Sequence, residues 1–204
     1  MSKAVIISAG SITDYEYIKS FIGKDDFVIC ADGGLAHAEK MGIKPHLTVG
    51  DFDSYKGSVT GEVKKFNPEK DYTDTHIAVT EALDKGYGEI VLLGCAGTRL
   101  DHTLANIGLL EYIAKRGSEG YLINENNIVT VICESSVIKN DGSRYVSIIP
   151  IGEVKGVSIK NMKYTLENYT MTFSASIGIS NEFIQGDGIV EIEEGSLIII
   201  KSRD

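Results

Sequence analysis

Short apolar runs and helical patterns alternate along the first two thirds of the chain. Apolar residues recur at helical spacing in three segments, residues 34–42, 73–86 and 102–117. Continuous apolar runs, typical of strands buried on both faces, occupy residues 3–8, 26–31, 46–50, 89–94 and 119–124. Strands that alternate with helices predict an α/β fold, here a Rossmann-like and mostly parallel sheet covered by helices.

The predicted helices carry signals for their ends and their buried sides. Gly42 suits a left-handed C-terminal cap of the first helix. Either Asp74 or Thr75 can serve as the N-cap of the second helix, which ends at Gly86. The third helix is expected to bury one apolar side, made of Leu104, Ile107, Leu110, Tyr112 and Ile113.

The pattern changes near residue 126, where helical periodicity disappears. Strand-like runs separated by turn residues then follow one another at residues 143–152, 156–161, 169–176 and 188–202. This spacing predicts a small antiparallel β-sandwich. We therefore expect two domains, an α/β domain of residues 1–130 and a sandwich domain of residues 131–204. A domain of about 70 residues has little core of its own, so we expect it to pack against the first domain or another chain.

Composition narrows the class of protein. Hydrophobic residues make up 43% of the chain and charged residues 24%, which are ordinary values for a globular protein. The net charge of −9 argues against nucleic acid as a partner. Three separated cysteines without a Cys-x-x-Cys pair suggest neither a zinc site nor a disulfide framework. No apolar run is long enough for a membrane span and no signal peptide is evident, so we expect a cytoplasmic protein.

Aspartates gather where predicted strands end. Asp32 follows the second strand, Asp51 and Asp53 follow the third, and Asp71 and Asp74 lie at the start of a helix. In extended backbone, Asp51 and Asp53 would point to the same side, roughly 6–7 Å apart, and would repel each other without a cation. Ligands of open α/β sheets bind beyond the carboxyl ends of the strands, so one cleft could hold these carboxylates. Clustered carboxylates without Cys or His suit a hard cation, with Mg²⁺ the first candidate.

Plainer interpretations of single motifs remain open. The segment from Asp32 to Gly34 could be a simple turn. Asp74 could be only a helix N-cap. We regard the set of aspartates at successive strand ends as the stronger signal, because each short motif taken alone is weak.

A glycine-containing turn at residues 92–106 offers groups for an anion. It matches neither a Walker A loop nor the dinucleotide fingerprint. Gly94 and Gly97 could bring backbone N–H groups close to an anion, and Arg99 adds a planar cationic fork suited to phosphate. On local grounds, Asp101 could equally be a helix N-cap and His102 a surface residue.

Five short motifs occur in the order in which thiamine pyrophosphokinases carry them. They read ADGG, GDFDS, KDYTD, GxxGxRLDHxLAN and SNEF. The chain therefore resembles this family over nearly its whole length. The resemblance implies a Mg²⁺-dependent transfer of the β,γ-diphosphate of ATP to the hydroxyl group of thiamine, giving thiamine diphosphate and AMP. It also implies a homodimer, with thiamine held between the α/β domain of one chain and the sandwich of the other.

The resemblance assigns roles to the motif residues. The carboxylates that would bind Mg²⁺ and phosphates are Asp51, Asp53 and Asp74, and either Asp71 or Asp74 would orient the attacking hydroxyl. The residues that would face ATP and its phosphates are Asp32, Gly33, Lys70, Gly94, Gly97 and Arg99. The residues that would contact thiamine are Asp101, Ser180, Asn181 and Tyr164. Some members stack a tryptophan on thiamine; this chain has no Trp, and Tyr164 takes the aligned position, where a tyrosine ring can still stack on a cation.

Other functions fit parts of the pattern. A diphosphokinase acting on another hydroxymethyl heterocycle, such as a pterin, would use the same metal site. A sensor that binds nucleotide or thiamine without catalysis is an alternative of a different class, although it has no need for so many cleft aspartates. A Mg²⁺-dependent phosphatase would release phosphate without an acceptor. The SNEF segment, which belongs to the sandwich, favours thiamine over a pterin as the acceptor.

Overall fold

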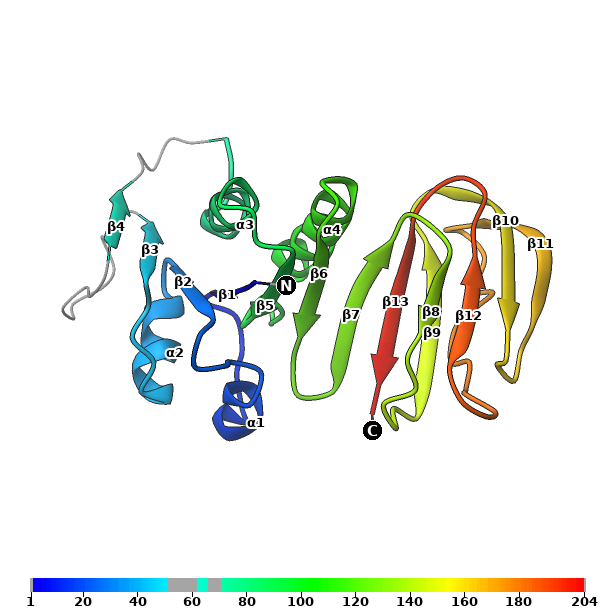
Figure 1. The fold of residues 1–204 in the computed structure, drawn as a ribbon, viewed down its shortest axis with the longest axis horizontal. Helices are drawn as coiled ribbons and strands as arrows, with labels where there is room; N and C mark the ends of the chain where they lie inside the picture. The colour runs from blue at the N-terminus through cyan, green and yellow to red at the C-terminus, as the bar shows by residue number, and fades with distance from the viewer. Residues whose placement is uncertain (1, 51–61, 66–70, 204) are drawn as a thin grey trace. The chain divides into compact units, whose positions relative to one another are not determined.

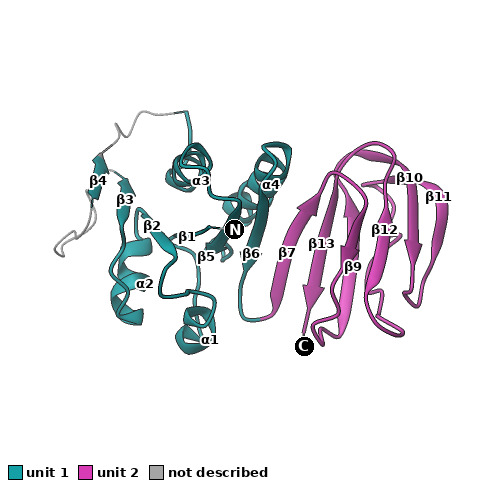
Figure 2. Ribbon diagram, viewed as in Figure 1, with its two compact units in different colours: residues 1–125 teal, residues 126–204 magenta. Residues whose placement is uncertain are grey.

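A computed structural model of the protein describes residues 2–50, 62–65 and 71–203. The chain divides into two compact units, Met1–Glu125 and Asn126–Asp204 (Figure 2). This division falls five residues before the boundary expected from the sequence. Three of the predicted site residues, Asp51, Asp53 and Lys70, lie outside the described residues.

The first unit contains a parallel sheet. Among its described residues the strands run in the order β4-β3-β2-β1-β5-β6, and each neighbouring pair is parallel. Their bounds are β1 (Lys3–Ile7), β2 (Phe27–Ala31), β3 (Leu47–Gly50), β4 (Glu62–Lys65), β5 (Glu89–Leu93) and β6 (Glu119–Ile123). The α/β prediction and its five strands are thus confirmed, whereas β4 was not predicted.

Helices cover both faces of this sheet. Their bounds are α1 (Tyr15–Lys19), α2 (Gly34–Met41), α3 (Asp74–Asp84) and α4 (Leu100–Lys115). Helices α1 and α2 lie on one face, and α3 and α4 lie on the other (Figure 1). Right-handed crossovers explain this arrangement. From β1 to β4 each new strand is added on one side of β1, whereas β5 and β6 are added on its other side. The order therefore reverses between β1 and β5.

The strands of the first unit are apolar on both sides because helices cover both faces. Ile6, Ile7, Ile29, Leu92 and Leu93 are fully buried, and together they form the centre of its core. Burial of one such side chain stabilises the fold by roughly 1.5–3 kcal/mol.

Two helix ends and the buried side of α4 differ from the expectations of the sequence. The N-cap of α3 is Thr73, whose hydroxyl accepts a hydrogen bond from the His76 backbone N–H; neither Asp74 nor Thr75 has that role. The N-cap of α4 is Arg99, so Asp101 is not a cap either. Leu104 is 58% exposed rather than buried, and the buried side of α4 consists of Asn106, Leu109, Leu110 and Ile113. The left-handed cap at Gly42 is confirmed, with φ of 66°.

The second unit is a β-sandwich, as predicted. Its strands are β7 (Asn127–Ile132), β8 (Ser136–Ile138), β9 (Tyr145–Pro150), β10 (Glu153–Lys160), β11 (Leu166–Thr172), β12 (Gly188–Glu191) and β13 (Leu197–Ser202). Strand β13 pairs antiparallel with β7 and β9, while β11-β10-β12-β8 form a separate antiparallel sheet. Apolar side chains from both sheets, among them Val146, Ile148, Val157 and Ile199, form one buried cluster. Strands β7 and β8 were not predicted.

None of the helices in the described part of the chain combines the length and the apolar character that crossing a bilayer requires.

Candidate active site

A cavity of about 500 Å³ opens in the first unit at the carboxyl ends of β1 and β5. Its walls come from the loops that follow these two strands, the end of β2, helix α2 and the first turns of α3 and α4. The order of strands reverses between β1 and β5, and ligands of open α/β sheets bind at such a reversal. The fold thus places the cavity at the carboxyl ends of the strands, where the aspartate pattern predicted a cleft.

Glycines let the two strand-end loops touch backbone to backbone. The Gly10 N–H donates to the Gly94 carbonyl at 2.6 Å, and the Ser11 N–H donates to the Ala96 carbonyl at 2.9 Å. A Cβ atom on Gly94 would lie 2.5 Å from the Ser8 carbonyl oxygen, and the residue also has φ of +61°. No other residue type fits this position without moving the backbone.

Asp32 leaves β2 in a left-handed conformation, with φ of 47°. Its N–H donates to the Val49 carbonyl at 2.8 Å, which fixes its backbone beside the end of β3. Gly33 then forms the N-cap of α2, and a Cβ atom on Gly34 would lie 1.9 Å from the Ile7 carbonyl oxygen. Left-handed geometry costs an ordinary residue roughly 1–2 kcal/mol, and Asp tolerates it better than most. The side chain is half-buried and lines the cavity.

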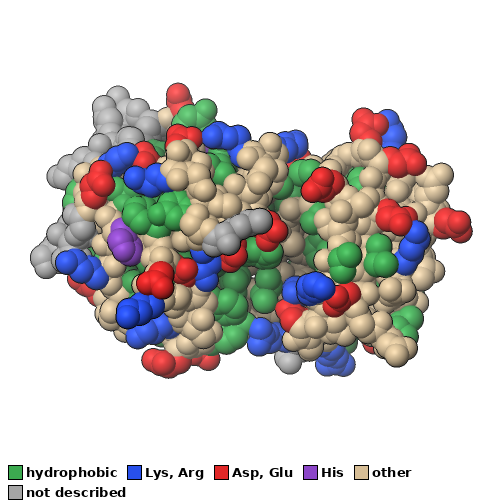
Figure 3. Space-filling model, in the orientation of Figure 1, with side chains coloured by type: hydrophobic (Ala, Val, Ile, Leu, Met, Phe, Trp, Pro, Cys, Tyr) green, Lys and Arg blue, Asp and Glu red, His purple; other side chains and the backbone are tan. Residues whose placement is uncertain are grey.

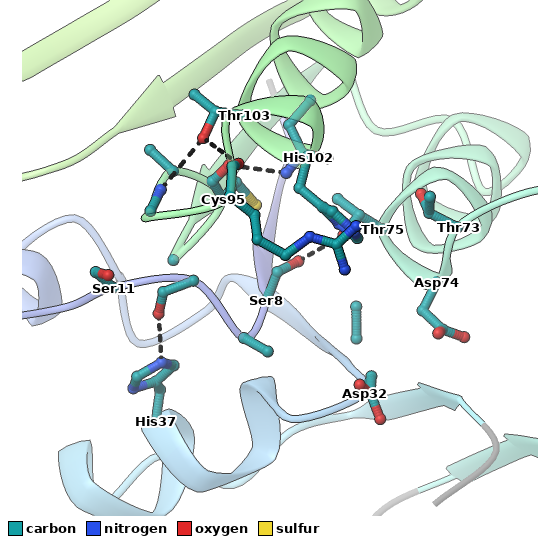
Figure 4. A pocket seen from close by; sticks show the side chains of 18 of the residues that line it. Ser8, Ser11, Asp32, His37, Thr73, Asp74, Thr75, Cys95, His102 and Thr103 are labelled. Atoms are coloured by element: carbon teal, nitrogen blue, oxygen red, sulfur yellow. Dashed lines mark hydrogen bonds between the residues drawn. The ribbon is translucent and has the colours of Figure 1, made fainter.

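Asp74 is the first residue of α3 and also lines the cavity. Figure 4 shows Asp32 and Asp74 on the same side of the cavity, with His37 on the opposite side. Next to Asp74, the buried Thr75 hydroxyl lies 2.9 Å from the Ser8 hydroxyl and ties the start of α3 to the end of β1. The fold thus brings carboxylates from two separate elements to one wall.

Arg99 and Asp101 form an exposed ion pair at the start of α4. The Arg99 Nε donates to Asp101 Oδ1 at 3.2 Å, and its Nη2 donates to Oδ2 at 2.6 Å. Hydrogen bonds from this guanidinium lower the pKa of Asp101 to about 2. Arg99 lines the cavity, whereas Asp101 does not. Because both side chains are mostly exposed, the pair can open when a stronger anion competes for Arg99.

The remaining candidate residues of the first unit differ in whether they line the cavity. Gly94 and Gly97 line the cavity; the Gly97 N–H donates to the Thr103 hydroxyl at 3.3 Å. Asp71 is exposed, and neither it nor Gly33 belongs to the lining. Within the described ranges, no three side chains of His, Cys, Asp or Glu gather closely enough to hold a metal ion.

Three predicted residues of the second unit lie together. Asn181 is 1% exposed, and its side-chain amide donates to the Tyr164 carbonyl at 2.7 Å and accepts from the Tyr164 N–H at 2.9 Å. Tyr164 itself is 58% exposed. Ser180 has φ of 53° and is exposed, and its N–H donates to the Ser147 hydroxyl. The buried amide therefore fixes the backbone that presents the tyrosine ring.

Sequence reasoning missed several polar residues of the cavity. Among them are Ser8, His37, Thr75, Thr103 and Asn106. Asn106 is buried, and its amide donates to the Cys95 carbonyl at 2.7 Å, holding the loop after β5 onto α4. A polar residue at a buried position of the helical pattern was the available signal for Asn106.

Acidic and basic side chains are interspersed over the face of the molecule in Figure 3, with no single basic patch there. A parallel sheet with a carboxylate-lined cavity at its order reversal, followed by a β-sandwich, defines a two-unit protein with a candidate ligand site in its α/β unit.

Comparisons with known proteins identify the family. The model described as "Thiamin pyrophosphokinase, catalytic domain" matches residues 18–122, and "Thiamin pyrophosphokinase, vitamin B1 binding domain" matches residues 134–199. The chain is 33% identical over 186 residues to thiamine pyrophosphokinase of Bacillus subtilis, covering 86% of this chain and 87% of that one. The chain belongs to the thiamine pyrophosphokinase family, and its activity is that of a thiamine diphosphokinase.

Solved structures agree over the whole chain. The crystal structure of the thiamine pyrophosphokinase from Bacillus subtilis has a TM-score of 0.90 and 28% identity, and covers 100% of both chains. That of the thiamin pyrophosphokinase from Geobacillus thermodenitrificans has a TM-score of 0.88 and 28% identity, and covers 100% of this chain and 98% of the other. The two-unit fold is thus shared along the full length.

Proposed function

We propose that the protein transfers the β,γ-diphosphate of ATP to the hydroxyl of thiamine with the help of Mg²⁺, releasing AMP. The observation that carries this proposal is the wall on which Asp32 and Asp74 meet, in a cavity whose lining also includes Arg99. Carboxylates on one side and a guanidinium in the same lining suit a metal-bound polyphosphate.

The donor set fits a hard cation. Asp32 and Asp74 supply oxygen ligands to the cavity, and the chain leaves β3 at Gly50, directly beside Asp32. Asp51 and Asp53 follow Gly50 in the sequence. We therefore assign Mg²⁺ to Asp51, Asp53 and Asp74, with Asp32 beside them. When bound, the ion would neutralise charge on the phosphates and favour attack on the β-phosphorus.

The chain's own groups would orient the reactants. Lys70 and Arg99 would hold phosphate oxygens, and the loop that carries Gly94 and Gly97 would bring backbone close to the phosphates. Asp74 lines the cavity whereas Asp71 is exposed, so Asp74 is our choice for the group that orients the thiamine hydroxyl. Phosphoryl transfer depends mainly on such positioning and on charge stabilisation.

In the homodimer proposed below, thiamine would bind to the group formed by Tyr164, Ser180 and Asn181 of one chain, with Asp101 contributed by the first unit of the other chain. The thiazolium ring is a cation, and a tyrosine face attracts cations. The buried Asn181 amide would act by fixing Tyr164, which it holds through two hydrogen bonds.

We further propose a homodimer. The second unit exposes large apolar side chains, Tyr169, Phe173, Ile177, Ile179 and Ile184. Exposed apolar groups in such number favour association with another surface. The free thiols of Cys30, Cys95 and Cys133 fit a reducing compartment, and we place the enzyme in the cytoplasm.

The test is to incubate the protein with thiamine and ATP, with Mg²⁺ or with excess chelator, and to separate the products. We expect AMP and thiamine diphosphate in equal amounts, and only with Mg²⁺. AMP formed only with a pterin alcohol would move the substrate to another heterocycle. ATP and thiamine that bind without turnover would make the protein a sensor.

A further inference from the structure

His37 lines the cavity from α2, on the side away from Asp32 and Asp74, and belongs to none of the family motifs (Figure 4). It is half-buried. Both ring nitrogens have a partner. Nε2 lies 2.8 Å from the Gly10 carbonyl oxygen, and Nδ1 lies 2.8 Å from the Tyr15 hydroxyl oxygen.

These contacts fix the tautomer of the neutral ring. A carbonyl oxygen only accepts, so Nε2 must carry the hydrogen that it donates to Gly10. Nδ1 then has a free lone pair and accepts from the Tyr15 hydroxyl. The Lys40 ammonium donates to the same hydroxyl oxygen at 3.3 Å. The chain of donors therefore runs from Lys40 through Tyr15 and His37 to the Gly10 carbonyl.

Gly10 also bonds to the other loop of the cavity, the one that follows β5. Its N–H donates to the Gly94 carbonyl at 2.6 Å, while its own carbonyl accepts from His37. Gly10 and Gly94 both line the cavity. One peptide segment thus joins helix α2 to the loops after β1 and β5. The glycine itself has no side chain with which to hold its place, so the two hydrogen bonds define its position.

We propose that His37, oriented by Tyr15, is a positioning residue for ATP: it holds the backbone wall opposite the carboxylates. The inference rests on the proposed function, because it assigns ATP to this cavity. ATP bound through its phosphates on the side of Asp32 and Asp74 would extend along this wall. Because the wall is already fixed, ATP binding would lose less conformational entropy. The ring acts through Gly10, not on the reacting atoms.

Two amide substitutions separate the roles of the two nitrogens. In His37→Gln the side-chain amide can reach the place of Nε2 and donate to Gly10, whereas in His37→Asn the amide is too short and lies near Nδ1. Loss of one hydrogen bond predicts that His37→Asn raises the KM for ATP about fivefold, with kcat and the KM for thiamine changed less than about twofold. His37→Gln should retain the KM of the wild type within about twofold.

Tyr15→Phe tests whether Tyr15 orients the His37 ring. It also provides a second variant if His37→Asn does not fold. It leaves Nδ1 without its donor, so the KM for ATP should rise about twofold to threefold with kcat unchanged. A wild-type KM for Tyr15→Phe would overturn the role of Tyr15. Equal effects of His37→Asn and His37→Gln, or a KM for thiamine that rises together with that for ATP, would overturn the role of His37.

His46→Gln is the matched control. His46 also bonds to backbone, accepting from the Val28 N–H at 3.0 Å, but it lies at the amino end of β3, away from the cavity. Its KM for ATP should equal that of the wild type, and a rise as large as in His37→Asn would contradict a local effect. Calorimetric titration of ATP and Mg²⁺ without thiamine should repeat the same order of affinities.

The wild-type protein is assayed first, so the two failures remain distinct. Absence of thiamine diphosphate from ATP in the wild type would overturn the proposed function. Normal turnover of the wild type together with a wild-type KM in His37→Asn would overturn only the inference about His37.

Discussion

The two units build their candidate sites in different ways. In the first unit, the loops at two strand ends touch backbone to backbone, and the carboxylates of Asp32, just after β2, and Asp74, in α3, lie on one wall. In the second unit, one buried amide, Asn181, fixes the segment that presents an exposed tyrosine ring. Under the proposed function, the first arrangement would supply charge and rigidity for phosphate chemistry, and the second would offer a flat surface to a cationic ring. We infer that chemistry depends on the first unit and that thiamine affinity depends mainly on the second.

Asp74→Asn should have the largest effect. The amide keeps the shape of the side chain but removes its charge, so we expect kcat to fall by about 100-fold or more. The melting temperature should remain near that of the wild type. Asp84→Asn, at the other end of the same helix and paired with Arg116 on the surface, is the control and should retain full activity. Full activity of Asp74→Asn would remove this carboxylate from the site.

Gly34→Ala should test how rigid the frame of the first unit is. The new Cβ would lie 1.9 Å from the Ile7 carbonyl oxygen, so helix α2 has to move away from β1. We expect the free energy of unfolding to fall by roughly 3 kcal/mol, as in overpacked cores, measured by denaturant titration.

Gly108→Ala gives the matched comparison. It lies within α4, and a Cβ atom there meets nothing within 4 Å. Helix propensity predicts that this change stabilises the protein by about 1 kcal/mol. If both alanine variants unfold at the same denaturant concentration, the close contact at Gly34 is not a constraint.

Asn181→Ala should show how strongly thiamine binding by the second unit depends on one amide. Its loss frees the Tyr164 backbone, so we expect the KM for thiamine to rise about tenfold while the KM for ATP stays the same. Asn140→Ala, in an exposed turn of the same unit, should change neither constant. An effect of Asn181→Ala on ATP alone would assign the amide to the other substrate.

Thr48→Val should have the smallest effect and the opposite sign. Thr48 is fully buried in β3, and its hydroxyl has no hydrogen-bond partner among the described residues, unlike the amide of Asn181. Removing an unpaired buried hydroxyl should raise the free energy of unfolding by about 1 kcal/mol. A decrease of similar size would show that the hydroxyl has a partner.

Burial on both faces explains which elements were predictable. Strands β1, β2, β3, β5 and β6 appear in the sequence as continuous apolar runs because helices cover both sides of their sheet. Strand β4 lies at the edge of the sheet and reads Glu-Val-Lys-Lys, so it carries no such signal. Helix α1 has only five residues, too few to show a helical period.

Local ambiguity explains the errors. Thr73, Asp74 and Thr75 are all good N-cap residues, and only tertiary contacts decide among them. Leu104 fits an apolar stripe, but the helix turns Asn106 inward instead, where its amide bonds to the Cys95 carbonyl. A strand end pointed to Asp32 and a helix start pointed to Asp74, and both line one cavity. The contact of His37 with Gly10 joins residues 27 positions apart, and no local pattern indicates it.

Calorimetric titration of thiamine into Asp74→Asn and Asn181→Ala, each with ATP withheld, tests the division between the units most directly. We expect Asp74→Asn to bind thiamine with the affinity of the wild type and Asn181→Ala to bind it about tenfold more weakly. Equal affinities of the two variants, or weaker binding by Asp74→Asn alone, would contradict this division.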